Sequence, residues 1–233
     1  MKHFAMLLAT SALATVCHGQ PPVAAFDFDE GSGSRARDSS PHGQIARIHQ
    51  ADWARGLDGS ALSFARPEAA VRVPSRRWLQ LGSQLSLSAW IYPTIADGHS
   101  RIIIAKNDEY LLRMDKQAEG GRISFFVQVG APAVTWEPRV CSKAPPTLHA
   151  WHHVAATWDG ARLRLYLDGE LQGETPRSGF PNPNPYPAMI GNFEYPSCHG
   201  GNFGGLIDQV RIHARALTPA EARAEFAAGR SAP

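Results

Sequence analysis

Aromatic and amide side chains gather in two stretches of the second half of the chain. Residues 182–186 read Asn-Pro-Asn-Pro-Tyr, and residues 192–202 read Asn-Phe-Glu-Tyr-Pro-Ser-Cys-His-Gly-Gly-Asn. Exposed aromatic rings stack on the apolar faces of sugars, while amides and charged groups hydrogen-bond to the hydroxyls. This composition predicts carbohydrate recognition by two loops. The alternative is that the rings cover an edge of the fold and that proline and asparagine only form turns.

Two cysteines connect the second of these stretches to a third one. If an N-terminal leader that contains Cys17 is removed, Cys141 and Cys198 remain, and an even number of cysteines in an exported chain favours a disulfide over two free thiols. In the chain-entropy view such a long loop gains about 4 kcal/mol at most. The bond would tether residues 192–202 to residues 136–141. The predicted carbohydrate-binding residues are Trp136, Arg139, Tyr186, Asn192, Tyr195, His199 and Asn202.

Two acidic residues stand at strand positions that alternate with apolar ones. Glu30 follows Phe26 and Phe28 at a spacing of two, and Asp208 lies between Leu206 and Val210 in the same way. Such residues share a face of a strand, and a carboxylate that faces a core needs a partner. Calcium binds carboxylate and carbonyl oxygens and would supply one. The alternatives are backbone N–H groups, water, or an arginine such as Arg211 or Arg215. The predicted ligands of a structural calcium ion are Asp208 first, then Glu30 and Asp38.

The sequence lacks the residue patterns of the common catalytic sites. A retaining glycosidase needs two carboxylates about 5 Å apart, and the chain has no Glu-x-Asp-x-x-Glu run; its densest acidic group, residues 27–30, falls on an expected strand and turn. His152 and His153 are consecutive and point to opposite faces of a strand, which argues against zinc. No Gly-x-Ser-x-Gly elbow or phosphate-binding glycine loop occurs. No catalytic residue is therefore predicted.

Short antiparallel strands must position these loops. Residues 151–169 alternate apolar and polar side chains on both sides of Asp159-Gly160, and a second Asp-Gly pair turns the chain again at 168–169. Two hairpin signals this close predict a meander and an all-β sandwich. Further strands are predicted at 23–28, 59–64, 70–73, 85–92, 101–105, 110–114, 122–129, 133–136, 187–190 and 206–212. Thr218, Pro219 and Glu221 form a capping box and predict one short helix from Pro219 to about Ala227.

Composition and the N-terminus indicate an exported protein. The net charge of +2 lacks the basic excess typical of proteins that bind nucleic acid. Residues 1–19 combine Lys2 and His3 with an apolar run and small residues, which predicts a signal peptide too short to span a bilayer. Cleavage after Ala14 and a lipid on Cys17 are the alternatives. We expect one domain over residues 20–233, no transmembrane segment, and a secreted or periplasmic location.

Several segments, taken in order, resemble the LamG-like jelly roll of the concanavalin A-like lectin/glucanase superfamily. The resemblance spans about residues 23–226 and lies in residues 26–33, 38–40, 56–64, 87–93, 151–169 and 203–217. It implies two curved antiparallel sheets and carbohydrate or protein binding outside the cell, often with calcium. It also implies a structural role for His153, because the family has a histidine at the matching position.

The sequence thus predicts an all-β, antiparallel jelly-roll sandwich with a short C-terminal helix. Its expected function is noncatalytic recognition of an extracellular glycan by a secreted module. Two alternatives stay open: a polysaccharide hydrolase or lyase of the same fold, and an adhesion or envelope-structural module that binds a cell-surface protein.

Overall fold

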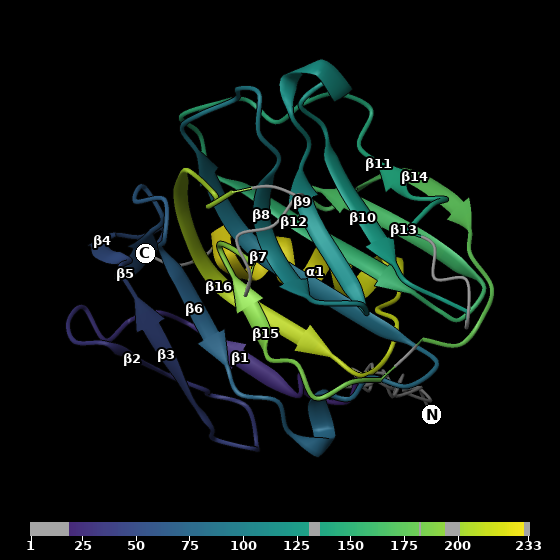
Figure 1. The fold of residues 1–233 in the computed structure, drawn as a ribbon, viewed down its shortest axis with the longest axis horizontal. Helices are drawn as coiled ribbons and strands as arrows, with labels where there is room; N and C mark the ends of the chain where they lie inside the picture. The colour runs from purple at the N-terminus through teal and green to yellow at the C-terminus, as the bar shows by residue number, and fades with distance from the viewer. Residues whose placement is uncertain (1–18, 131–135, 182, 194–200, 231–233) are drawn as a thin grey trace, which may run out of the picture.

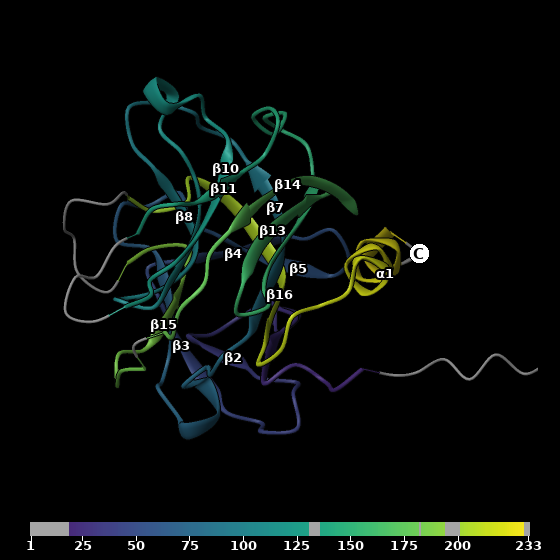
Figure 2. The same ribbon diagram turned by 90° about the vertical axis from the view of Figure 1, so that its right-hand side faces the viewer.

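Two antiparallel sheets packed face to face form the molecule, as Figure 2 shows edge-on. The computed structural model describes residues 19–130, 136–181, 183–193 and 201–230. Within these ranges sheet A has the order β14-β13-β12-β7-β16-β5-β4, with β1 also paired to β16, and sheet B has the order β11-β10-β9-β8-β15-β6-β3-β2. The expected all-β antiparallel sandwich is confirmed.

The strands have the following bounds. Sheet A comprises β1 (Ala24–Phe26), β4 (Asp52–Arg55), β5 (Ser60–Ser63), β7 (Leu85–Pro93), β12 (His152–Trp158), β13 (Arg162–Leu167), β14 (Glu170–Pro176) and β16 (Gly205–His213). Sheet B comprises β2 (Arg35–Arg37), β3 (Ile45–His49), β6 (Ala70–Val73), β8 (Arg101–Lys106), β9 (Tyr110–Met114), β10 (Ile123–Val127), β11 (Val140–Cys141) and β15 (Ala188–Ile190). Figure 1 looks onto sheet B, with sheet A and helix α1 behind it.

The predicted meander is present as β12, β13 and β14. Val154, Ala156 and Trp158 point into the core and are fully buried, as the alternation of strand side chains requires. The Trp158 indole N–H donates to the Arg177 carbonyl at 2.7 Å, so the buried polar atom is satisfied. Gly160 has a φ of 90° in the first turn, a backbone conformation that favours glycine. The hairpin is therefore both a sheet element and a wall of the core.

Several strands lie where the sequence shows no clear alternation. In β3, Ile45 is 43% exposed, whereas the small Ala46 points inward and is buried. The large apolar side chain of this strand therefore faces outward, opposite to what the sequence pattern suggests. The first strand ends at Phe26, and Phe28 has a φ of 55°. The expectation that Glu30 continues the face of Phe26 is therefore wrong. The predicted strand 133–136 lies outside the described residues except for Trp136, which is not in a strand.

Helix α1 (Pro219–Arg230) covers the outer face of sheet A (Figure 2). The capping box is confirmed, because Glu221 N donates to Thr218 Oγ1 at 3.2 Å and Thr218 N donates to Glu221 Oε2 at 2.8 Å. Phe226 stacks on Trp90 with ring centres 5.6 Å apart, and Ala222 packs on β12 and β13. Among the described residues no helix has the length and apolar character needed to cross a membrane.

Polar groups lie buried between α1 and the sheet. Glu225 accepts a hydrogen bond from Ser88 at 2.6 Å and lies 3.0 Å from His213 Nε2. Burial opposes its ionisation, but these contacts outweigh burial and lower the pKa of Glu225. His153 is 2% exposed beside Trp90, and burial lowers its pKa to about 4. Its neighbour His152 points to the other side, with Nδ1 2.8 Å from Asp168. The two histidines thus face opposite ways, as expected.

His153 makes the fold sensitive to acid. The unfolded chain takes up its proton near pH 6.5, whereas the folded protein resists protonation until about pH 4. Stability is therefore full above pH 6.5 and falls between pH 6.5 and 4, by up to about 3 kcal/mol. We expect the free energy of unfolding of His153→Gln to depend less on pH between 6.5 and 4 than that of the wild type, as measured by urea unfolding across that range.

His152→Gln is the matched control. The hydrogen bond to Asp168 raises the pKa of His152, so its contribution is present in acid and is lost as the pH rises through the folded value. Removal of His152 should therefore make the loss of stability in acid steeper. A His153→Gln curve parallel to that of the wild type would contradict this account.

Candidate functional site

One row of side chains crosses the whole outer face of sheet B. Residues directly opposite each other on paired strands share a face, and the register gives the row Arg35, Arg47, Arg72, Met189, Ala105, Leu111 and Phe126. At one end the arginines are exposed, whereas at the other end Ala105, Leu111 and Phe126 are at most 4% exposed. Since the second group points away from the core, something else must cover it.

Trp136 and Phe193 provide part of that cover. Both are half-buried and pack on the cluster of Ile102, Ala105, Leu111 and Phe126. Trp136 belongs to the segment before β11, and Phe193 follows β15. Two of the stretches that the sequence singled out therefore meet over sheet B.

Arginine and aromatic side chains form a layered group there, which we call the Trp136 cluster: Arg113, Phe126, Trp136 and Arg139. The rings of Phe126 and Trp136 meet edge to face, with centres 6.3 Å apart. The guanidinium carbons of Arg113 and Arg139 lie 4.9 and 5.4 Å from the centre of the Phe126 ring, within the range of cation–π attraction. The half-buried Trp136 and Arg139 form the outer part of the cluster, and Arg113 is buried.

Carboxylates surround the cluster and are bound by its arginines. Arg113 contacts the fully buried Asp115 at 2.8 Å and Glu119 at 2.8 Å. Arg139 Nη1 lies 3.6 Å from Glu119 and 3.5 Å from the exposed Glu137. Burial opposes the charge of Arg139, but Asp115 and the contacts with Cys141 and Glu137 outweigh it and raise the pKa of Arg139. Both arginines are thereby held in place.

The predicted disulfide and two predicted binding residues depend on a loop that is not described. Cys198, Tyr195 and His199 lie outside the described residues. Cys141 is half-buried on β11 and is unpaired within them, with Sγ 3.2 Å from Ser124 Oγ. The Cys141–Cys198 bond stays a prediction.

The two predicted asparagines serve the backbone. Asn192 Nδ2 donates to the carbonyls of Pro67 and Ala69 at 3.0 and 3.3 Å. Asn202 is 8% exposed, donates to the Phe64 carbonyl and accepts from Arg101. These amides fix the chain between β15 and β16 to distant segments. They position the loop that carries Phe193 rather than presenting free amides.

Tyr186 belongs to a different loop, which the β8–β9 turn holds. Lys106 Nζ lies 2.7 Å from the Glu109 carboxylate, and Glu109 accepts from Asn184 N at 2.8 Å. Burial lowers the pKa of Lys106 and raises that of Glu109. Tyr186 is 36% exposed, and Phe180 in the same loop is 83% exposed. Phe180 was not among the carbohydrate-binding residues predicted from the sequence. It lies between Gly179 and Pro181, and these turn-forming residues are the signal that could have indicated its exposure.

Asp208, the principal predicted calcium ligand, is fully buried. It accepts hydrogen bonds from Leu57 N at 3.1 Å and Gln209 N at 2.7 Å. Burial raises its pKa to about 7; these N–H groups oppose the shift and the charge of Asp29 adds to it. Asp29, which accepts from Ser60 N, is an acidic neighbour that was not among the predicted calcium ligands.

Oxygen atoms gather beside Asp208 where Gly56 leaves space. A Cβ at position 56 would lie 2.6 Å from the Ser60 carbonyl oxygen and 2.7 Å from Asp208 Oδ2. Across the described ranges no three His, Cys, Asp or Glu side chains gather closely enough to hold a metal. A calcium ion at this place would therefore combine Asp208 and Asp29 with carbonyl oxygens, and the donor set is of the type that calcium takes.

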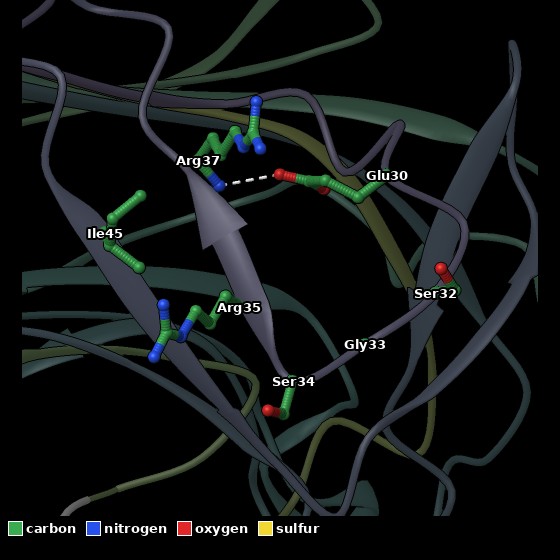
Figure 3. Close-up of a pocket in the computed structure, with 7 residues that line it drawn as sticks. All are labelled: Glu30, Ser32, Gly33, Ser34, Arg35, Arg37 and Ile45. Carbon is green, nitrogen blue, oxygen red and sulfur yellow. Dashed lines mark hydrogen bonds between the residues drawn. The ribbon is translucent and has the colours of Figure 1, made fainter.

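Glu30 and Asp38 have other partners. Glu30 Oε1 accepts from Arg37 N at 2.6 Å (Figure 3), and Asp38 Oδ1 accepts from Ala25 N and Ser40 N at 2.9 and 2.8 Å. The second oxygen of each carboxylate is buried without a hydrogen-bond partner in the described part of the chain. Hydrogen bonds from backbone N–H groups, one of the alternatives to calcium, thus satisfy one of the two oxygens of each carboxylate.

Solved structures with the same fold include binding domains of two kinds. Domain 4 of the extracellular arabinanase AbnA from Geobacillus stearothermophilus, solved with arabinotriose, has a TM-score of 0.68 and 20% identity; the match covers 89% of this chain and 98% of that one. The binding domain of Paraclostridial Mosquitocidal Protein 1 has a TM-score of 0.69 and 14% identity, with coverage of 88% and 52%. The binding domain of Botulinum Neurotoxin DC in complex with SialylT has a TM-score of 0.69 and 11% identity, with coverage of 91% and 52%.

The chain thus spans about half the length of the matched toxin domains and nearly all of the arabinanase domain. At these identities the likeness concerns the fold, which is a jelly roll. No curated protein matches the sequence. The family model Laminin_G_3, described as the concanavalin A-like lectin/glucanases superfamily, matches residues 66–223. The chain therefore belongs to the concanavalin A-like lectin/glucanase superfamily.

Proposed function

We propose that this chain is an exported, noncatalytic module that binds carbohydrate on the outer face of sheet B. The observation that carries the proposal is the Trp136 cluster, in which a half-buried indole and the Arg139 guanidinium pack on Phe126, with Arg113 buried against the same ring. A sugar ring needs an apolar platform and nearby hydrogen-bond donors, and the cluster combines both. The arabinotriose complex of the arabinanase domain supports it by analogy of fold.

The carboxylates near the cluster favour binding over hydrolysis. Asp115 is fully buried and accepts from Arg113 and Ser124. Glu119 contacts Arg113 at 2.8 Å and Lys116 at 3.3 Å. A general acid needs a proton to donate, whereas these carboxylates hold arginines in position. We therefore assign them a positioning role.

Calcium belongs to the same proposal as a structural ion. It would be held by Asp208 and Asp29 together with the Ser60 carbonyl oxygen. An ion there would compensate a fully buried carboxylate whose pKa is raised by burial. It would stabilise the Gly56–Ser60 turn against β16, on the sheet opposite to the Trp136 cluster.

We expect Trp136→Ala to weaken glycan binding at least tenfold, which corresponds to about 1.4 kcal/mol. The reason is the loss of the aromatic platform above Phe126. Arabinotriose is the first probe, followed by the tightest ligand of a neutral glycan array, with affinities from calorimetry. Trp78→Ala is the matched control, because Trp78 is also half-buried but stacks on His42, between β2 and β3, and is not part of the Trp136 cluster.

Equal affinity of wild type and Trp136→Ala would refute the assigned surface. No binding to any glycan, with and without calcium, would refute carbohydrate recognition itself. Release of reducing ends or unsaturated products from polysaccharides would show that the module is catalytic.

Calcium should raise the melting temperature of the wild type, and chelator should lower it. Saturation at a hundred times the dissociation constant corresponds to about 2.7 kcal/mol. Asp208→Asn should abolish this response. Asp38→Asn should lower the melting temperature but keep the calcium increment, because Asp38 binds Ala25 N and Ser40 N. A melting temperature that is indifferent to chelator would rule out the ion.

Export is tested by the N-terminus of the mature protein. If residues 1–19 are a signal peptide, expression of the full chain with its leader should yield a protein that begins at Gln20, read by Edman degradation or mass spectrometry. Retention of Met1 in a protein recovered inside the cell would contradict the proposal.

A further inference from the structure

The arginine end of the sheet B row carries an unusual charge pattern. Arg35, Arg47 and Arg72 stand directly opposite one another on β2, β3 and β6. Neighbouring strands lie about 4.8 Å apart, and like charges directly opposite each other are destabilising. Arg37 and His49, two positions along from Arg35 and Arg47, are exposed on the same face. We call these five residues the arginine face.

Three arginines on other strands of this chain bind carboxylates. Arg113 binds Asp115, Arg164 binds Asp159 at 2.7 Å, and Arg162 binds Glu174 at 2.7 Å. In contrast, Arg35 and Arg47 form no ion pair with any carboxylate in the described ranges, and Arg37 contributes only its backbone N–H to Glu30. Folding therefore places the Arg35 and Arg47 side chains opposite each other with no carboxylate paired to either inside the described part of the chain.

Two adjoining hollows open over this face. One of about 590 Å³ is lined by Glu30, Ser32, Gly33, Ser34, Arg35, Arg37 and Ile45 (Figure 3). The other, of about 360 Å³, is lined by Ser34, Arg35, Arg47, Ile48, His49 and Arg72. Ser34 and Arg35 border both, so together the hollows form one groove from the edge strand β2 toward β6.

We propose that this groove binds an acidic polysaccharide, with the guanidinium groups of Arg35 and Arg47 on its carboxylate or sulfate groups. Guanidinium forks match such anions bidentately. The hydroxyls of Ser32 and Ser34 line the same groove and suit the sugar hydroxyls between the anionic groups. The inference rests on the proposed function, since it names the class of glycan, but it uses residues outside the Trp136 cluster.

A nucleic acid or a lipid surface fits the groove less well. Single-stranded nucleic acid needs aromatic rings on which its bases stack, and among the described residues no phenylalanine, tyrosine or tryptophan lines either hollow. Ile45 is the one large apolar side chain exposed on the described part of this face, too little to anchor in a membrane.

The test uses the mature chain, titrated calorimetrically with sodium polygalacturonate, dextran sulfate and uncharged dextran, and compares it with Arg35→Gln/Arg47→Gln. We expect both acidic polymers or one of them to bind at least tenfold more tightly than dextran, and the double variant to lose that preference. Binding of polygalacturonate alone would identify carboxylates as the recognised anionic groups, and binding of dextran sulfate alone would identify sulfates. Relief of the like charges should leave the melting temperature of the variant equal or higher.

Arg162→Gln/Arg164→Gln is the matched control, because it removes the same charge from strand β13 of the other sheet. It should keep the acidic preference. Equal loss in both double variants would reduce the effect to net charge and overturn the inference. Equal binding of charged and uncharged dextran, or tighter binding of a single-stranded DNA or phosphatidylserine vesicles, would also overturn it. Binding of arabinotriose or another neutral glycan through Trp136 would survive any of these results.

Discussion

Burial of alternating side chains between two sheets is the constraint on which the rest of this structure depends. Each strand sends every second residue inward, so the core takes Val154, Ala156 and Trp158 from β12 and equivalent residues from its neighbours. The remaining side chains must face outward on both sheets. The elements that cover each outer face determine which surfaces remain accessible to a ligand.

The two outer faces are covered by different elements. Sheet A is closed by α1, where Phe226 stacks on Trp90 and Glu225 meets His213 and Ser88. Sheet B is covered at one end by Trp136 and Phe193, and at the arginine end two hollows lie over it in the described part of the chain. The arginines differ accordingly: Arg113 is bound by Asp115, whereas Arg35 and Arg47 form no ion pair with a carboxylate of the described residues. One face thus offers an aromatic surface and a cationic groove.

The sequence predicted the features that depend on residues close together in the chain. The hairpin of β12 and β13, the capping box and the opposite directions of His152 and His153 all follow from residues a few positions apart. The roles of Asn192 and Asn202 could not be predicted in this way, because their acceptors at Pro67 and Phe64 are 125 and 138 residues away. The arginine row depends on the register of three strands, and β3 was hidden by its outward Ile45 and inward Ala46. Asp29 becomes a partner of Asp208 only when the first and last strands come together.

The central claim is that glycan binds on the outer face of sheet B, and the six tryptophans of the chain allow a direct measurement. Indole N–H signals followed by ¹H–¹⁵N NMR during titration with a bound glycan report on both sheets at once. The account predicts a shift of the Trp136 signal, with Trp158 in the core and Trp90 under α1 unchanged. A saturating ligand that shifts Trp90 and leaves Trp136 in place would contradict it.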